Sequence, residues 1–196
     1  MLYQLAAGEV DHDSGVAQMA QLSARLAYAM MCLTLVWGVL TSLGLVNRLT
    51  GRQALRSSHM ILATLTLGFA GLHFLAFLYM RASTWTVIEL LVPFNSGVEF
   101  RHTMGILAFE GMLAAAVVVG LRRYMTYYRW LWIHRLAYPA FVLGVAHSLL
   151  GAVANGHLEI LWLGGITLLV PAVTLAALRF LPAKALATTG LIEDAP

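Results

Sequence analysis

Residues 58–80 read SHMILATLTLGFAGLHFLAFLYM, and residues 131–153 read LWIHRLAYPAFVLGVAHSLLGAV. Each stretch is an apolar run that contains two histidines and no acidic residue. A transmembrane helix needs about 20 predominantly apolar residues. The two stretches therefore predict two membrane-spanning helices, each with a pair of imidazoles at depth.

The composition of the whole chain agrees with a membrane location. Of its 196 residues, 60% are hydrophobic and 11% are charged, and the mean hydropathy is +0.80. Soluble domains carry roughly 25% charged and 45–50% apolar residues. This balance excludes a disordered chain, a nucleic-acid binder and a secreted disulfide scaffold. A single cysteine, Cys32, excludes an internal disulfide and any multi-cysteine metal site.

Five spans account for nearly the whole chain. Three further apolar runs complete the set, at about residues 25–46, 102–121 and 159–181. We therefore predict an all-α fold, a polytopic membrane bundle of five transmembrane helices at residues 25–181. Residues 1–24 are expected to form an extracytoplasmic N-terminal tail and residues 182–196 a short cytoplasmic tail. Residues 81–101, broken by Pro93 and Gly97, favour a lid on the interface over a sixth span.

The charges predict the orientation of the bundle. Nine of the twelve basic residues lie on one side, and only Arg25, Arg81 and Arg101 lie on the other. By the positive-inside rule the N-terminus is outside and the C-terminus is in the cytoplasm. The excess of arginine over lysine, eleven to one, favours a GC-rich bacterium. We expect a multi-pass protein of the bacterial inner membrane, surrounded by lipid.

The spacing of the four intramembrane histidines predicts two pairs at matched depth. His59 and His73 are 14 residues apart, or roughly 21 Å of helical rise, and His134 and His147 are 13 apart, or roughly 20 Å. The two spans run in the same direction because one crossing separates them. His59 and His134 then share a depth near the cytoplasmic face, and His73 and His147 share one near the outer face.

Two such pairs fit two stacked haem b groups with two axial imidazoles each. Two imidazoles saturate the iron, which favours electron transfer over oxygen binding. A single zinc or copper site would need its ligands much closer together. Arg135 is a candidate to offset a haem propionate. Clearance for the flat macrocycle is expected at the glycines near the ligands, namely Gly68, Gly71 and Gly144.

One feature of the second histidine helix opposes this interpretation. Thirteen positions at 100° each leave His147 about 140° around a straight helix from His134, so both cannot face one seam. Pro139 lies between them and can kink the helix. An ideal helix does not account for the spacing.

Other readings of the four histidines stay open. Intramembrane polar residues usually face the bundle interior with a partner, so the histidines can be packing residues or proton carriers of a small transporter or scaffolding protein. A quinol-oxidising cytochrome b also uses two histidine pairs on parallel helices, but it has more spans and a recognisable quinol loop. Glu110, an intramembrane acid, is a functional candidate for pairing, proton transfer or hydrogen bonding.

The histidines stand in a sequence context that resembles a known superfamily. The matching features are His59-x13-His73, Trp130-x3-His134-Arg135-Leu136-x-Tyr138, His147, the stretch 50–55 and the tetrapeptide 91–94. They resemble the ferric-reductase-like transmembrane domain of ferric reductases, NADPH oxidases and the haem subunit of the bacterial methionine sulfoxide reductase system. The resemblance covers about residues 25–180. The paired histidine spacing is its specific part.

The resemblance implies a function and a ligand set. His59 with His134 would ligate the inner haem, and His73 with His147 the outer one, as the membrane subunit of an oxidoreductase. Electrons would pass from a cytoplasmic donor to an extracytoplasmic acceptor or partner subunit. Many family members have six spans, and the larger ones add a flavin and NADPH domain, for which the fifteen residues after the fifth span leave no room. A separate reductase, a flavin at the inner face or membrane quinol would supply the electrons.

Two charged clusters are candidates for contact with donor and acceptor. The inner arginines are candidates to bind a flavin phosphate or an acidic partner, or they only determine topology; they are Arg52, Arg56, Arg122, Arg123 and Arg129. At the other end, Arg81, Arg101 and His102 flank the expected mouth above the outer haem. They are candidates to hold an anionic acceptor or a partner subunit, and His102 can equally be a plain interfacial residue.

Overall fold

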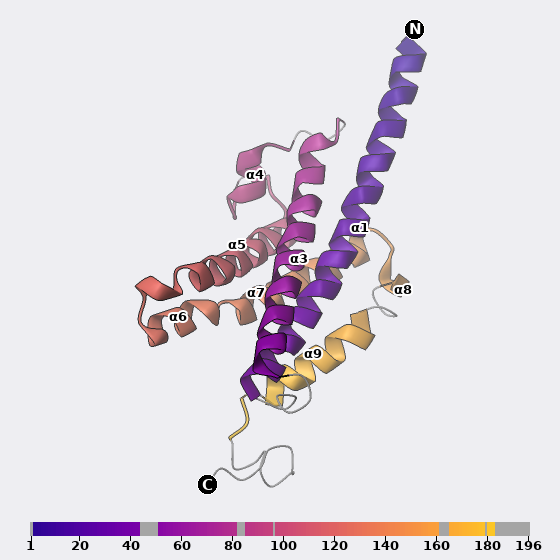
Figure 1. The fold of residues 1–196 in the computed structure, drawn as a ribbon. Coiled ribbons are helices and arrows are strands. Elements are labelled where there is room, and N and C mark those ends of the chain that lie inside the picture. The colour runs from indigo at the N-terminus through magenta and orange to yellow at the C-terminus, as the bar shows by residue number, and fades with distance from the viewer. Residues whose placement is uncertain are drawn as a thin grey trace, which may run out of the picture. The chain divides into compact units, whose positions relative to one another are not determined.

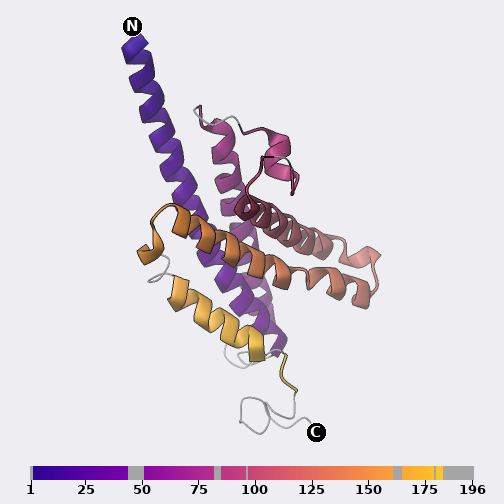
Figure 2. The ribbon, with the colours of Figure 1, turned by 180° about the vertical axis from the view of Figure 1, so that it is seen from behind.

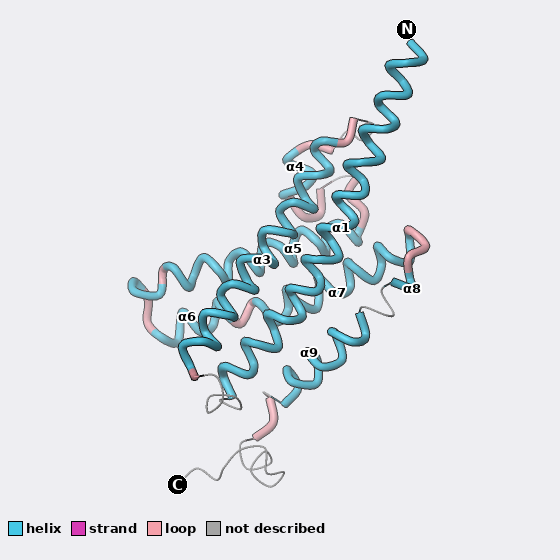
Figure 3. The backbone as a smooth tube through the Cα atoms, turned by 45° about the vertical axis from the view of Figure 1, so that its right-hand side comes forward, coloured by secondary structure: helices cyan, strands magenta, loops and turns pink. Residues whose placement is uncertain are grey.

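In the computed structural model, the described residues are 2–43, 51–81, 85–95, 97–160, 165–178 and 180–182. Every regular element among them is a helix, as Figure 3 shows, so the expected all-α fold is confirmed for this part of the chain. The elements are α1 (Leu2–Leu43), α3 (Arg52–Tyr79), α4 (Val87–Leu91), α5 (Phe100–Gly120), the 3₁₀ turn η1 (Arg122–Tyr124), α6 (Tyr127–His134), α7 (Ala137–Ala154), α8 (Leu158–Ile160) and α9 (Ile166–Leu178).

Four helical segments within the described ranges are long and apolar enough to cross a membrane. They are His12–Leu43, Arg52–Tyr79, Phe100–Gly120 and Tyr127–Ala154. They correspond to the first four predicted spans. The fifth predicted span, 159–181, contains the shorter apolar helix Thr167–Leu178, and its residues 161–164 and 179 lie outside the described residues. The count of five and the orientation stay predictions.

Two segments expected to lie outside the spans, the N-terminal tail and the lid at 81–101, both contain helix. Helix α1 begins at Leu2, so residues 2–24 continue the first span as one helix instead of forming a separate segment. The expected lid, 81–101, contains the short helix α4, which begins at a capping box between Thr86 and Glu89. Pro93 follows α4, and Phe94 and Gly97 adopt positive φ angles of 61° and 93°. This connection therefore has a defined turn structure.

The chain folds as two compact units that divide α1 and α3 between them. The first unit comprises Met1–Tyr28 and Thr66–Leu158, and the second comprises Ala29–Leu65 and Glu159–Pro196. The buried apolar side chains of the second unit include Cys32, Val39, Leu55 and Ala172.

Within the first unit, α5 packs along α6 and α7 (Figures 1 and 2). Small residues make this contact close. A Cβ built on Gly111 would lie 2.9 Å from the Cβ of Ala140, and Ala108 and Ala115 are also buried. Helices inside a membrane associate through such small residues, because lipid provides no hydrophobic drive for their association.

Large apolar side chains point outward on all four long helices. Leu22, Ile61, Val117 and Val142, one on each helix, are between 52% and 64% exposed. A water-soluble bundle would bury these faces. Their exposure is compatible with contact to lipid along the helices.

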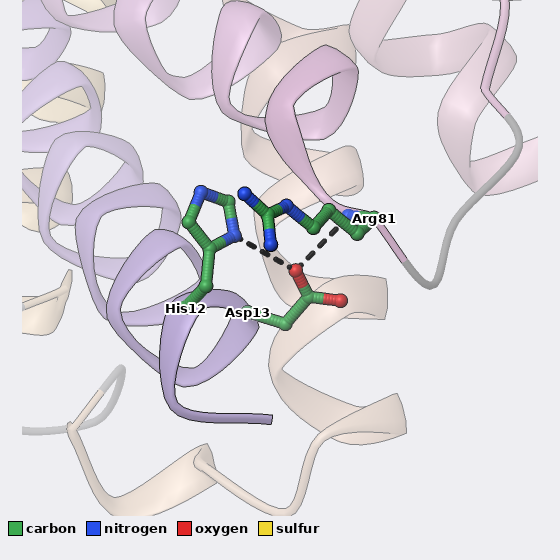
Figure 4. Close-up of polar contacts among 3 residues, drawn as sticks. All are labelled: His12, Asp13 and Arg81. Carbon is green, nitrogen blue, oxygen red and sulfur yellow. Dashed lines mark hydrogen bonds and ion pairs between the residues drawn. The ribbon is translucent and has the colours of Figure 1, made fainter. Parts of the chain in front are cut away.

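In the first unit, an acidic residue ties α1 to the end of α3 (Figure 4). Asp13 Oδ1 accepts a hydrogen bond from the main-chain N–H of Arg81 at 2.9 Å, and the Nδ1 atom of His12 lies 3.1 Å from the same oxygen. The contact joins residues that are 68 positions apart in the sequence. It therefore holds the N-terminal part of α1 beside the residue that opens the connection to α4.

Candidate functional site

All four histidines of the predicted spans make the same contact, a hydrogen bond from Nδ1 to a main-chain carbonyl of a neighbouring helix. The pairs are His59 with Thr34 at 3.1 Å, His73 with Ala20 at 2.9 Å, His134 with Ala115 at 3.1 Å and His147 with Arg101 at 2.7 Å. A carbonyl oxygen only accepts, so each Nδ1 carries the proton. In a neutral imidazole the lone pair is then on Nε2. Histidines that bind metals through Nε2 are typically oriented by such a bond.

The acceptors repeat at one spacing on two helices. Ala20 and Thr34 are 14 residues apart on α1, and Arg101 and Ala115 are 14 apart on α5. The same helical rise that separates the two histidines of each span thus separates their acceptors. Carbonyl and imidazole meet at two levels along each helix pair.

Two glycines make room for two of the imidazoles. A Cβ on Gly38 would lie 3.0 Å from Cε1 of His59, and a Cβ on Gly105 would lie 2.8 Å from Cε1 and Nδ1 of His147. Each glycine stands four residues after the accepting carbonyl, the position whose N–H normally bonds to that carbonyl in an α-helix. A side chain there would keep the imidazole away from the oxygen.

His73 and His147, the predicted outer pair, come together in the first unit. Their ring centroids are 6.2 Å apart and their planes are inclined at 67°. A metal–nitrogen bond of about 2.0 Å and about 1.1 Å from nitrogen to ring centre would put two imidazole centroids about 6.2 Å apart across one ion. The observed separation is the one expected for two imidazoles that share an ion. The two rings lie near each other as the spacing predicted, and their role as ligands of one iron stays a prediction.

The predicted inner pair is divided between the two units. His59 lies in the second unit and His134 in the first, and their pairing stays a prediction. His134 has a local support of its own, because the indole of Trp130 stacks on its ring with centroids 5.3 Å apart and planes 9° apart. The guanidinium of Arg122 lies 4.8 Å from the Trp130 ring centroid.

A break in the helix lies between the two histidines that are 13 residues apart. α6 ends at His134, and α7 begins at Ala137. Because Pro139 has no N–H to give to the carbonyl four residues earlier, the Arg135 oxygen instead accepts from Tyr138. Such i→i+3 turns advance about 120° per residue, so each one adds about 20° and the turns at this break cover only part of the 140° offset. His134 and His147 both reach α5, contrary to the expectation for a straight helix.

Aromatic rings surround the His73–His147 end. Phe77 contacts His73 edge-on at 5.2 Å, Trp85 contacts Phe77 at 6.2 Å, and His102 contacts Trp85 at 5.0 Å. Arg101 pairs with Glu99 at 2.6 Å, beside an open cavity of about 380 Å³. These contacts therefore place Arg101 and His102, two of the residues expected above the outer haem, near the His73–His147 pair.

Several predicted residues stand apart from these contacts. Arg135 is exposed in the turn between α6 and α7, so its role at a propionate stays a prediction. Glu110 is half-buried in α5, and its carboxylate has no hydrogen bond or ion pair with the described residues. A Cβ on Gly68 or Gly71 would meet no atom within 4 Å. Within the described ranges, no three His, Cys, Asp or Glu side chains cluster as a metal site.

The sequence interpretation missed the main-chain acceptors and the glycines beside the rings. Gly38 and Gly105 lie four residues after their carbonyls, but no sequence pattern tells which carbonyl an imidazole from another helix will reach. Comparison with family models, with curated proteins and with solved structures finds no match for this chain.

Proposed function

We propose that this chain is a dihaem b-type electron-transfer protein of the membrane, the membrane subunit of an oxidoreductase. His73 with His147, and His59 with His134, would be the axial ligands of the two haems. The observation that carries the proposal is the His73–His147 pair: two imidazoles at axial-ligand separation, each with Nδ1 bound to a carbonyl of a different helix. The resemblance to the ferric-reductase-like domain supports the same ligand set.

The chain's own residues supply the conditions that such a site needs. The carbonyls of Ala20 and Arg101 select the tautomer with its lone pair on Nε2 and limit rotation of the rings. Apolar neighbours such as Phe74 and Phe109, stacked 6.2 Å apart, keep water from the interior. Bound haem iron would supply a one-electron couple at each level. Two axial imidazoles leave that iron no open position, which favours electron transfer.

The direction of transfer follows from the predicted orientation. With the N-terminus outside, the His59–His134 level is nearer the cytoplasm and receives electrons from a reductase, a flavin or quinol. The His73–His147 level passes them to an extracytoplasmic acceptor or partner subunit. An inside-negative potential favours this outward movement by about 2.3 kcal/mol per charge per 100 mV.

A reduced-minus-oxidised spectrum of the purified full chain, with haem stoichiometry from pyridine haemochrome, tests the proposal. We expect two b-type haems per chain. His73→Ala and His147→Ala should each lower the ratio to one, because each removes an axial ligand of the same iron. His157→Ala, at an exposed histidine after α7, is the matched control and should keep both haems. A folded protein without haem would overturn the proposal and return the histidines to packing or proton transfer.

A further inference from the structure

Three buried side-chain nitrogens in the described part of the chain lack a hydrogen-bond partner. They are Arg101 Nε, His102 Nδ1 and Trp130 Nε1. Arg101 has Glu99 as its ion-pair partner. The Nδ1 atom of a neutral histidine is a donor in one tautomer and an acceptor in the other, whereas the indole N–H is always a donor. Trp130 is therefore the side chain whose donor has no acceptor among the described residues.

The cost of this unmet donor is considerable. A buried N–H without an acceptor loses about 1–3 kcal/mol relative to one that is bonded, and buried tryptophans usually find a partner for their N–H. Nε1 is closed to solvent here, so neither bulk water nor a lipid headgroup satisfies it. An acceptor for this N–H would therefore have to be held inside the folded protein.

The position of Trp130 indicates which buried group that is. Its ring lies parallel to His134 at 5.3 Å, four residues earlier on α6. The cation of Arg122 lies over the Trp130 ring, so a positive charge and an N–H donor stand together beside this histidine. An N–H donor and a guanidinium are groups that commonly bind an anionic carboxylate.

We infer that Trp130 is a positioning residue that donates its indole N–H to a carboxylate of the tetrapyrrole bound by His134, with Arg122 as the accompanying charge. The inference rests on the proposed function and extends it. It assigns to Trp130 the propionate contact that the sequence alone suggested for Arg135, an exposed residue of the adjoining turn. Through this bond α6 would hold both the axial ligand and the edge of the same macrocycle.

Trp130→Phe tests this assignment because it keeps an aromatic ring on His134 and removes only the N–H-bearing part. The full-length protein loaded with haem in the cell is examined by resonance Raman spectroscopy and by redox titration. We expect the propionate bending mode of one haem to shift and its midpoint potential to fall, since the carboxylate charge near the iron is no longer partly neutralised. The other haem should be unchanged.

The matched control is Trp132→Phe, the same substitution two residues along α6 at a side chain that is 74% exposed. It should leave both haems as in the unmutated protein. Trp130→His, which has a ring N–H, should reverse part of the change seen in Trp130→Phe. Ultraviolet resonance Raman spectra of the unmutated protein with and without haem read the indole hydrogen bond directly, even if the variants fold poorly.

The outcomes separate this inference from the proposed function. Two haems with unchanged propionate modes and potentials in Trp130→Phe would overturn the role of Trp130 and leave the dihaem proposal standing. An indole N–H that stays unbonded in the haem-loaded protein would do the same. A folded, unmutated protein without haem would overturn both.

Discussion

The protein has two helix pairs, α1 with α3 and α5 with the helix formed by α6 and α7. In both pairs the histidines of one helix are hydrogen-bonded to carbonyls of the other, but the helices differ in continuity. In the first pair, α1 and α3 are uninterrupted, and acceptors and histidines both repeat every 14 residues. In the second pair, α5 is uninterrupted but its partner is broken between α6 and α7, and histidines 13 residues apart meet carbonyls 14 residues apart. The shorter histidine spacing thus occurs in the pair whose helix is broken.

The two helix pairs also differ in which of their two histidines lies against a glycine. In the first pair Gly38 stands against His59, and in the second Gly105 stands against His147. The remaining two acceptors have Ala24 and Val119 at the corresponding position. The imidazole–carbonyl contact therefore tolerates different neighbours, and its length does not follow the glycines: it is 2.7 Å at His147, beside Gly105, and 3.1 Å at His59, beside Gly38.

Gly105→Ala should break this comparison most strongly. Its new methyl group would lie 2.8 Å from two imidazole atoms, so His147 must leave the Arg101 carbonyl. We expect at least a twofold loss of haem at the His73–His147 site, measured by pyridine haemochrome. Gly38→Ala, whose nearest contact is 3.0 Å, should have a smaller effect on the His59 site.

Gly120→Ala is the control for both substitutions, because a Cβ there meets nothing within 4 Å. It should keep full haem content. Equal haem loss in Gly120→Ala and Gly105→Ala would mean that the glycine beside His147 has no special role.

Gly111→Ala should show that α5 and α7 pack more closely at this glycine than the first helix pair does at Gly71. Its Cβ would lie 2.9 Å from that of Ala140, so α5 and α7 must separate. Overpacking costs about 1–3 kcal/mol, and the gain in helix propensity offsets about 0.5–1 kcal/mol. We expect a net loss of about 1–2 kcal/mol in the free energy of unfolding, measured by denaturant titration in detergent.

Gly71→Ala, in the first helix pair, is the matched substitution. Nothing lies within 4 Å of its Cβ, so only the propensity gain remains. A loss of stability as large as that of Gly111→Ala would contradict the packing difference between the pairs.

The smallest expected effect lies in the connection between the two pairs. Hydrogen bonds from the main-chain N–H and then the side chain of Thr86 lower the pKa of Glu89 below its ordinary value. Because the folded-state pKa is the lower one, this stabilisation of α4 is present above the unfolded pKa of about 4.5 and is lost as pH falls through the folded pKa. Thr86→Ala should raise the pKa only in part, since the main-chain donor remains.

Carboxyl NMR titration of Glu89 in the unmutated and Thr86→Ala proteins measures this shift. An unmutated pKa at or above the ordinary glutamate value would contradict the capping box as the structure has it. Haem content and spectra should be the same in both proteins, because α4 contains none of the four histidines.

Much of the helical architecture was predictable because apolar length is a local property. The runs around His59, His73, His134 and His147 predicted two long helices, and both are present, one with a break. The start of α1 at Leu2 was not predicted, since Glu9 and Asp13 interrupt the apolar pattern without interrupting the helix. Pro139 predicted a kink in this helix, and the structure places the break about one turn before the proline, after His134.

The four histidines of the candidate site were found from the sequence, whereas the groups that hydrogen-bond to them were not. Matched spacing on parallel spans was enough to pair His73 with His147. The Nδ1 bonds to Ala20 and Arg101 join residues 53 and 46 positions apart, and no local pattern encodes them. The indole N–H of Trp130 was visible in the sequence, but only the packed structure shows that no described residue accepts from it.

By itself the sequence determined an all-helical, strongly apolar chain with two histidines on each of two long helices, because span length and residue type depend on neighbours in the chain. Only the tertiary structure decided which carbonyls bind the imidazoles, which glycines admit them and which donor is left over. These contacts depend on how helices pack, and a shift of about 1.5 Å, one residue of rise, would change every partner.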